Sequence, residues 1–423
     1  MIKLIRLDMI SLICNKLNKS NFFNYYIVTP WIYAIGTCSE HIDIANRISS
    51  FKKKEIIVIK ISIFQKLLNY HVCNHDLFDN LDFGNKKNNK ILKTILTILI
   101  NLEFIFIRIF VLLNDKTLNL KLPEYIRFPQ IGIKEVAYNN KDLFKKDFNK
   151  IKPYPNHSTV KLNSFKSEQN KRIFDKTFNI TNNKIVCLHV RDSKYRADSK
   201  KRTYRNSKVD TYIPAIEYLI KKNYVVVRLG DKKKEKINFS HQNFIDLYDN
   251  KHDIYLINNC SFFIGTLSGP MDISYLFQKP TLTTNVHSMY IGFPRNFKDR
   301  VIFKKAVLNN KEILLNEHLD LPFSYHNYLE QMKDLNFIDN TPNEILEATK
   351  EFVNNLEKNN FDKTIIQKKF NDRLKKKMQS FFSDNSSDNS FHKHPLAINF
   401  IRWSKTQQGA VCNFILNKEF KEN

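Results

Sequence analysis

A histidine and an arginine stand at the end of an apolar run in the stretch KIVCLHVRDSKYR, residues 184–196. An unbroken apolar run bounded by polar residues predicts a strand that is buried on both faces. Open α/β sheets build their ligand sites at the carboxyl ends of such strands. The Arg191 guanidinium can bind a diphosphate through two parallel hydrogen bonds, and His189 can donate a further hydrogen bond. We therefore interpret the pair as phosphate contacts of a nucleotide-linked donor, with a solvated basic loop after a core strand as the alternative.

The chain from 182 to 287 alternates apolar runs with helical patterns. Runs at 185–190, 224–229, 261–264 and 280–284 predict strands, and helices are predicted to begin near residues 210, 253 and 270. This alternation predicts a parallel sheet with helical crossovers, in which the loops that follow the strands lie at one edge. The residues expected to converge there are Arg191, Asp231, Thr266, Ser268, Gly269 and Asn285.

A loop of small residues at 266–269 precedes one of the predicted helices. Backbone N–H groups at a helix N-terminus favour phosphate, so we predict Thr266, Ser268 and Gly269 as donor-binding residues. A plain turn with an N-cap is the alternative. Asp231 is a further donor-binding candidate, and a turn residue after Gly230 is its alternative.

The loop between 193 and 208 is rich in basic and aromatic residues that either contact the same ligand or lie in solvent: Tyr195, Arg196, Arg202, Tyr204, Arg205 and Asn206. Neither GxGxxG nor GxxxxGK[ST] occurs in the chain. The sequence therefore gives no support for a dinucleotide fingerprint or a P-loop.

The amino-terminal half contains the candidates for a general base. A predicted strand within 22–35, a glycine turn at Gly36, a helix capped by Ser39 and a strand at 55–63 are the opening of a Rossmann-like half. The predicted turn carries Glu40, His41 and Asp43, each of which accepts a proton near neutral pH when its environment is tuned. We predict Glu40 and His41 as catalytic; the alternative is that the acidic residues only favour the positive helix N-terminus.

Composition excludes fewer classes of protein than the motifs do. The net charge of +26 admits nucleic acid, an anionic membrane or a phosphorylated substrate as a partner. Lys is abundant and Gly scarce, the bias of an AT-rich coding sequence, so only local charge is weighed. The six scattered cysteines predict reduced thiols and a cytoplasmic protein. The HVCNHD stretch at 71–76 lacks a second ligand cluster, so no metal site is predicted.

A helix at 91–113 is the most apolar long segment. Asn101, Glu103 and Arg108 interrupt it, and a charge at the bilayer centre costs roughly 2.5 to 3.5 kcal/mol. A buried or membrane-surface helix is therefore favoured over a span. Peripheral contact with anionic lipid is an alternative that nearby basic residues support: Lys86, Lys87, Lys90 and Lys93. No signal peptide is predicted, because charge interrupts the first apolar residues.

The segments LHVRDSKYR, YRNSKVDTYIPAIEYLI, YVVVRLGD and FFIGTLSGP occur in this order. As a set they resemble a family of bacterial glycosyltransferases from surface-polysaccharide and lipopolysaccharide gene clusters. The HVR element is similar to that of GT-B fucosyltransferases, where His and Arg contact the donor diphosphate. The resemblance covers about 184–305 and implies donor contacts at His189, Arg191 and 266–269. It departs from the expected pattern at Pro270, where an aliphatic residue would stand.

These observations together predict an α/β protein with two Rossmann-like domains that face each other, as in GT-B transferases. We expect an acceptor domain at 1–150, a donor-binding domain at 155–330 and a partly flexible helical tail at 331–423. The resemblance implies transfer of a hexose or deoxyhexose from a nucleotide-diphosphate sugar to a cell-surface glycan or lipid-linked acceptor. The sugar nucleotide is a co-substrate, and no further cofactor or metal is expected.

Two other classes of function remain open from the sequence. A nucleotide-sugar epimerase shares the two-lobed fold but needs no acceptor. A nucleic-acid-binding protein would use the net charge of +26 and bind with a steep salt dependence. Because the chain lacks RNP-like, zinc-finger and basic-zipper motifs, no specific nucleic-acid partner is predicted.

Overall fold

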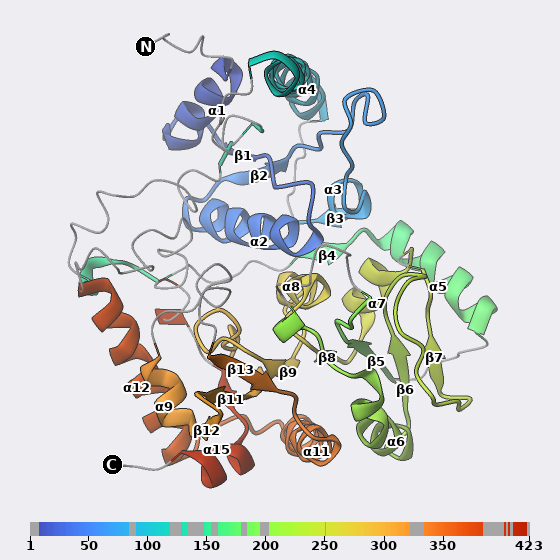
Figure 1. The fold of residues 1–423 in the computed structure, drawn as a ribbon. Helices are drawn as coiled ribbons and strands as arrows, with labels where there is room; N and C mark the ends of the chain where they lie inside the picture. The colour runs from blue at the N-terminus through green and yellow to red at the C-terminus, as the bar shows by residue number, and fades with distance from the viewer. Residues whose placement is uncertain are drawn as a thin grey trace. The chain divides into compact units, whose positions relative to one another are not determined.

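A computed structural model describes residues 8–83, 90–118, 128–129, 131–132, 148–153, 160–178, 184–194, 203–249, 251–321, 334–383, 402, 405–406 and 409–420. The chain divides into two compact units (Figure 1). Unit 1 comprises 1–139 and 154–163, and unit 2 comprises 140–153 and 164–423. The predicted boundary between 150 and 155 lies partly outside the described residues.

Unit 2 is built on a seven-stranded sheet in the order β14-β10-β9-β8-β5-β6-β7, and every strand pair in it is parallel. The strands are β5 (Lys184–His189), β6 (Tyr224–Arg228), β7 (Phe244–Asp246), β8 (Phe262–Gly265), β9 (Thr281–Val286), β10 (Arg300–Phe303) and β14 (Ala410–Val411). The α/β prediction is confirmed. The apolar runs that predicted strands lie in β5, β6, β8 and β9, whose central residues are buried, as expected when helices cover both faces.

The strand order reverses direction between β5 and β8. From β5 the chain adds β6 and then β7 on one side, and then returns to add β8, β9 and β10 on the other. This is the arrangement of a Rossmann sheet, in which the crevice at the reversal lies outside the carboxyl ends of the two central strands. The topology therefore marks the ends of β5 and β8 as the place where a ligand would bind.

Helices connect and cover these strands (Figure 1). They are α5 (Ser164–Phe178), α6 (Ile213–Lys221), α7 (Asp253–Asn259), α8 (Gly269–Leu276), α9 (Leu315–Asp320), α11 (Pro342–Glu357), α12 (Ile365–Ser383) and α15 (Asn413–Glu419), with short helical turns at η3 (Phe148–Lys150) and η5 (Val209–Tyr212). Thr341 and Glu344 form a capping box at the start of α11, where Pro342 suits the first turn. A small antiparallel sheet, β12 (Lys311–Ile313), β11 (Lys305–Leu308) and β13 (Leu335–Ile338), completes the unit.

The segment predicted as a helical tail is part of unit 2. Phe370 and Leu374 of α12 and Leu416 of α15 are fully buried in the same core as Val186 of β5. β14 pairs with β10 and extends the main sheet. The described helices of 331–423 therefore pack into the core of unit 2, whereas residues 384–401 of the predicted flexible part lie outside the described residues.

Unit 1 contains one βαβ element: β1 (Tyr25–Val28), α2 (Ile35–Phe51) and β2 (Glu55–Val58), with the two strands parallel. Its other elements are α1 (Met9–Lys19), α3 (Asp76–Asp79), α4 (Lys90–Leu113) with the π-turn η1 (Asn114–Leu118), and β3 (Leu81–Asp82) paired with β4 (Lys161–Leu162). Helix α2 covers one face of the β1–β2 sheet, and α1 with α4 lies on the other (Figure 1).

The predicted start of the first long helix was wrong by five residues, since the N-cap is Ala34 and not Ser39. Helix α2 begins at Ile35 after Ala34, so Gly36 and Ser39 lie inside the helix rather than in a turn before it. The Ser39 hydroxyl donates to the Ile35 carbonyl at 2.8 Å, which is a bond within the helix and not an N-cap. The segment 36–43 is therefore the first two turns of a helix.

Candidate functional site

The residues after β5 and β8 meet directly. His189 is the register partner of Gly265 in the parallel pair. The Thr266 N–H donates to the His189 carbonyl at 3.0 Å, and the Arg191 N–H donates to the Thr266 hydroxyl at 2.9 Å. The predicted convergence of Arg191 with the 266–269 loop is confirmed, and it lies at the reversal of strand order.

Gly265 permits this close approach. A Cβ atom at Gly265 would lie 2.2 Å from the His189 carbonyl oxygen, which is backbone and cannot swing aside. Only glycine leaves room for the two chain segments to cross at this distance. The glycine therefore sets the spacing between the end of β5 and the loop that leads to α8.

Ser268 joins the loop to His189. It is the N-cap residue of α8, but its hydroxyl makes no cap bond and instead lies 2.9 Å from His189 Nδ1. Pro270 has no N–H to offer, and the Met271 N–H donates to the Ser268 carbonyl. Fewer N–H groups are therefore available to a phosphate at the start of α8 than predicted, since Pro270 and Met271 contribute none to a ligand.

His189 is neutral throughout the physiological range. Burial is the main cause that lowers its pKa to about 3, and the positive charges of Lys234, Arg228 and Arg191 lower it further. When a serine hydroxyl donates to Nδ1 of a neutral imidazole, the proton resides on Nε2. The ring can then donate a hydrogen bond to an anion without carrying charge itself.

Arg191 is held by the loop that follows β5. Its side chain is 7% exposed, and its Nε donates to the Asn206 side-chain carbonyl at 3.1 Å. The Ser207 N–H donates to the Arg191 carbonyl, and Arg205 reaches the Leu267 carbonyl at 3.5 Å. Arg205, Asn206 and Ser207 therefore belong to the site rather than to bulk solvent. Tyr195, Arg196 and Arg202 lie outside the described residues.

A buried ion network lies beside His189, and sequence reasoning missed it. Arg228 at the end of β6 is 0% exposed and pairs with Asp192 at 3.6 Å and with Asp246 at 3.3 Å. Lys234 pairs with Asp246 at 2.6 Å. The signal was an arginine inside the apolar run YVVVRL. The network fixes Asp192, the residue that follows Arg191.

Two of the residues predicted to converge at this edge, Asp231 and Asn285, form hydrogen bonds with other parts of the chain. Asp231 is exposed, and its carboxylate accepts the Lys233 N–H at 2.8 Å, as in an Asx-turn. Asn285 pairs with Asn340 through two backbone-to-side-chain bonds of 2.7 Å. Donor binding by Asp231 stays a prediction, and Asn285 serves to join β9 to the segment before α11.

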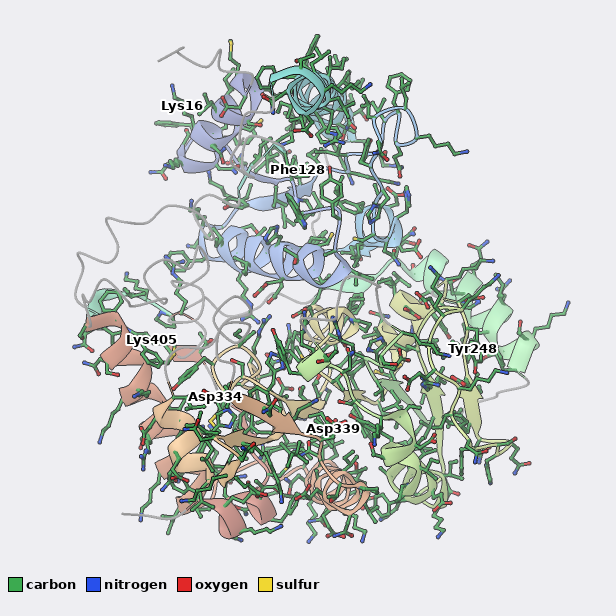
Figure 2. All side chains as sticks on the ribbon, viewed as in Figure 1. Lys16, Phe128, Tyr248, Asp334, Asp339 and Lys405 are labelled. Carbon is green, nitrogen blue, oxygen red and sulfur yellow. The ribbon has the colours of Figure 1, made fainter. Side chains whose placement is uncertain are left out.

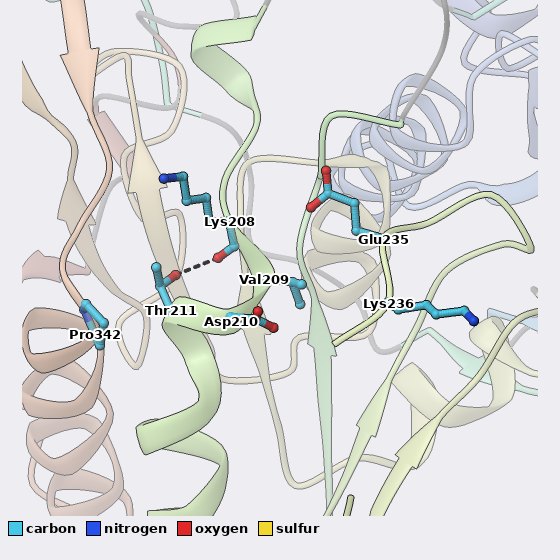
Figure 3. Close-up of a pocket in the computed structure, with 7 residues that line it drawn as sticks. All are labelled: Lys208, Val209, Asp210, Thr211, Glu235, Lys236 and Pro342. Atoms are coloured by element: carbon cyan, nitrogen blue, oxygen red, sulfur yellow. Dashed lines mark hydrogen bonds between the residues drawn. The ribbon is translucent and has the colours of Figure 1, made fainter. Parts of the chain in front are cut away.

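A surface pocket of about 350 Å³ lies at the same edge of the sheet (Figure 3). Its lining residues come from η5, from the loop after β6 and from the start of α11: Lys208, Val209, Asp210, Thr211, Glu235, Lys236 and Pro342. The Thr211 hydroxyl donates to the Lys208 carbonyl at 2.6 Å across the pocket floor (Figure 3). The Glu235 N–H donates to Asp192 at 2.7 Å, so the pocket adjoins the ion network although His189 and Arg191 do not line it.

The predicted catalytic residues lie on α2 in unit 1. His41 is buried, its Nδ1 accepts the Trp31 N–H at 3.1 Å, and burial lowers its pKa to about 4. A neutral imidazole that accepts at Nδ1 carries its proton on Nε2. His41 is therefore a donor at its second nitrogen in this arrangement, which favours Glu40, a half-buried neighbour, as the base.

Aromatic rings gather where β1 leads into α2. Trp31 lies 4.9 Å from Tyr33 and 5.4 Å from Phe128, and Tyr33 lies 5.9 Å from His71, between ring centroids. Phe128 is labelled in Figure 2. Within the described residues no three His, Cys, Asp or Glu side chains are grouped to hold a metal ion. The HVCNHD stretch instead supplies one ring, His71, to this cluster.

Comparison with known proteins adds little to this geometry. No family model matches the chain, and no curated protein does. Among solved structures, the glycosyl transferase family 9 from Veillonella parvula DSM 2008 is similar at 10% identity, covering 82% of this chain and 78% of that chain with a TM-score of 0.28. A likeness at that TM-score does not establish a shared fold.

Proposed function

We propose that this protein is a glycosyltransferase that moves a hexose or deoxyhexose from a nucleotide-diphosphate sugar to a glycan or lipid-linked acceptor. One observation carries the proposal. The strand reversal between β5 and β8 brings Arg191, the neutral His189 and the 266–269 loop into direct contact at the edge where Rossmann sheets bind nucleotides. The sequence resemblance to glycosyltransferases supports the same assignment.

In the proposed donor complex, Arg191 binds the diphosphate and His189 donates from Nε2. The Asn206 bond to Arg191 Nε orients the guanidinium, and the Ser268 hydroxyl donates to His189 Nδ1 in this proposal, which leaves the proton on Nε2. Thr266, Ser268 and Gly269 shape the loop against the donor, and Asp231 is the remaining donor-binding candidate. These groups would also stabilise the charge that grows on the leaving diphosphate.

The proposed reaction is a direct displacement at the anomeric carbon. The acceptor oxygen forms a bond to that carbon while the bond to the donor diphosphate breaks, and the diphosphate leaves with the electron pair. The acceptor proton passes to a base, for which we propose Glu40 or His41 with Glu40 preferred. No metal and no cofactor beyond the sugar nucleotide are part of the proposal. We place the reaction in the bacterial cytoplasm, in the synthesis of surface polysaccharide or lipopolysaccharide.

Thermal unfolding in the presence of UDP, GDP, ADP or CDP tests the donor site. A nucleoside diphosphate at a hundred times its dissociation constant should add about 2.7 kcal/mol to the free energy of unfolding. The Arg191→Ala variant should lose this stabilisation, whereas Arg172→Ala, at an arginine whose side chain is 84% exposed on α5, should keep it. Equal responses from wild type and Arg191→Ala would remove the proposed donor site.

A further inference from the structure

Helix α4 of unit 1 carries a continuous apolar face that no described part of the chain covers. Its large apolar side chains recur every three or four residues, with these exposed fractions: Ile91 74%, Ile95 49%, Ile98 52%, Leu102 45%, Phe106 62%, Ile109 44% and Leu113 56%. At 1.5 Å per residue this stripe runs roughly 33 Å along the helix. An apolar patch of this extent marks an interaction surface.

The opposite face of α4 is fixed to unit 1 by polar contacts. Asn101 accepts the Ser62 N–H at 3.1 Å and donates to the Lys60 carbonyl, and Glu103 accepts the Ile10 N–H of α1 at 2.8 Å. Arg108 donates to the Leu68 carbonyl at 2.9 Å. These three residues are the ones that interrupt the apolar run, so their positions are explained by the fold of unit 1.

In length and composition α4 could cross a membrane, and it is the one described helix that could. A span would break the contacts of Asn101, Glu103 and Arg108 and leave their polar groups in hydrocarbon, where each unsatisfied group costs several kcal/mol. A helix that keeps one face on the protein and offers the other lies along a membrane surface instead.

Basic residues of unit 1 favour anionic lipid over a second copy of the chain as the partner of the apolar stripe. Besides Arg108, which is bonded to the Leu68 carbonyl, the described residues of α1, of α4 and of the 61–70 loop carry five basic side chains: Lys16, Lys19, Lys66, Lys90 and Lys93. Their single acidic residue, Glu103, is buried against α1. Lys86 and Lys87 lie outside the described residues. A second copy docked here by two-fold symmetry would set these basic groups against one another, whereas anionic lipid headgroups complement them.

We propose that unit 1 binds the surface of an anionic membrane through the exposed apolar face of α4. Phe64 and Leu67, exposed by 59% and 77% in the loop that Arg108 holds, extend the surface beyond the helix. The apolar side chains enter the boundary between headgroups and acyl chains while Lys90 and Lys93 meet the headgroups. The proposal goes beyond glycosyl transfer, because it needs neither donor nor acceptor.

Flotation of the full chain with lipid vesicles tests this surface. The protein should float with phosphatidylcholine vesicles that contain about one-third phosphatidylglycerol, and more weakly with phosphatidylcholine alone. Raising the salt from about 0.1 M to about 0.5 M should weaken binding several-fold, because exposed charges are then screened. No nucleotide is present, so failure here is separate from failure of the donor site.

Paired variants locate the contact. Ile98→Asp with Phe106→Asp should lower the vesicle partition coefficient on the order of tenfold or more, since apolar contact with lipid is replaced by negative charge. Ile338→Asp with Ile365→Asp, at side chains exposed by 49% and 73% in unit 2, should leave binding unchanged. Lys90→Glu with Lys93→Glu should reduce binding to the anionic vesicles more than to phosphatidylcholine.

Three results would overturn the proposal. The wild type could fail to float with anionic vesicles, or the α4 variant could float as well as the wild type. The third result is a wild-type dimer, seen by light scattering, that the α4 variant converts to monomer without any vesicle binding, which would assign the surface to a second copy of the chain. Thermal unfolding of each variant checks that the exposed substitutions leave the fold intact.

Discussion

His189, the last residue of β5 in unit 2, and His41, in α2 of unit 1, are both buried imidazoles, but their surroundings differ. His189 contacts the Ser268 hydroxyl and is surrounded by positive charge from Arg191, Arg228 and Lys234. His41 accepts a backbone N–H from Trp31 beside a cluster of aromatic rings, and burial alone lowers its pKa. The first environment suits an anion, and the second suits a neutral sugar or lipid group.

The two regions also differ in the secondary structure that supports them. The His189 region stands on seven parallel strands, and its loops are tied together across 75 residues of sequence by the bond from Arg191 to Thr266. The His41 region stands on a two-stranded sheet and one helix. We therefore expect binding of the donor to depend on unit 2 alone, and turnover to depend on both units.

The largest effect is expected from Glu40→Gln. Loss of a general base costs roughly 10² to 10⁴ in turnover, while the affinity for nucleoside diphosphate should not change. Turnover is measured as release of nucleoside diphosphate from the donor that the thermal screen identifies. His41→Gln serves as the matched variant and should cost less, because His41 is a donor at Nε2. A larger loss for His41→Gln than for Glu40→Gln would reverse the assignment of the base.

Arg191→Ala should lower turnover by about 10² and also weaken donor binding. The reason is that Arg191 is expected to hold the diphosphate both before and during its departure. Donor affinity and turnover therefore fall together, unlike in Glu40→Gln. If Arg191→Ala retained near-normal turnover, the contrast between the two regions would disappear.

Substitution of one glycine in each unit separates an effect on stability from an effect on donor binding. Gly265→Ala places a Cβ 2.2 Å from the His189 carbonyl, and Gly132→Ala places one 2.5 Å from the Ile27 carbonyl at a residue with φ of +74°. Each should lower the free energy of unfolding by about 1 to 3 kcal/mol in urea titrations. Only Gly265→Ala should also lose the response to nucleoside diphosphate. Loss of that response in Gly132→Ala would show that unit 1 takes part in donor binding.

The last effect is a pH dependence of stability, which is smallest near neutral pH. His189 takes up a proton at pH 6.5 when unfolded but only at about 3 when folded, so its contribution is complete above pH 6.5 and is lost as the pH falls toward 3. His189→Gln should remove a slope on the order of 1 kcal/mol per pH unit between those limits. Burial raises the pKa values of Asp253 and Asp299 to about 7, so these two residues make the free energy of unfolding change with pH in the opposite direction. Their effect is the same in wild type and in His189→Gln, so it cancels when one pH profile is subtracted from the other. Parallel profiles for wild type and variant would show that His189 is charged when folded.

The part of the fold that local patterns encode could be predicted. Continuous apolar runs marked β5, β6, β8 and β9, and their alternation with helices implied that the end of β5 meets the loop of Thr266 and Ser268. The start of α2 was misplaced because Ser39 is a common N-cap residue, while the actual cap at Ala34 carries no side-chain signal.

Features that depend on distant pairing could not be predicted. β7 has three residues and β14 has two, too few for a periodic pattern, and each is defined by its neighbour in the sheet. The network of Arg228, Asp192, Asp246 and Lys234 brings together four charged residues that each look solvated in sequence. Burial of such groups follows from tertiary packing, which no local window contains.

The pairing of β10 with β14 also has a consequence during protein synthesis. Phe303 ends β10, and Ala410 begins the strand that covers its open edge. At 5 to 20 residues per second, a ribosome needs roughly 5 to 20 seconds to make the intervening segment. Throughout that interval the nascent sheet exposes the unpaired backbone of β10. Slow codons in this stretch would prolong the time during which the exposed edge can aggregate. A chaperone that shields the edge would shorten that time.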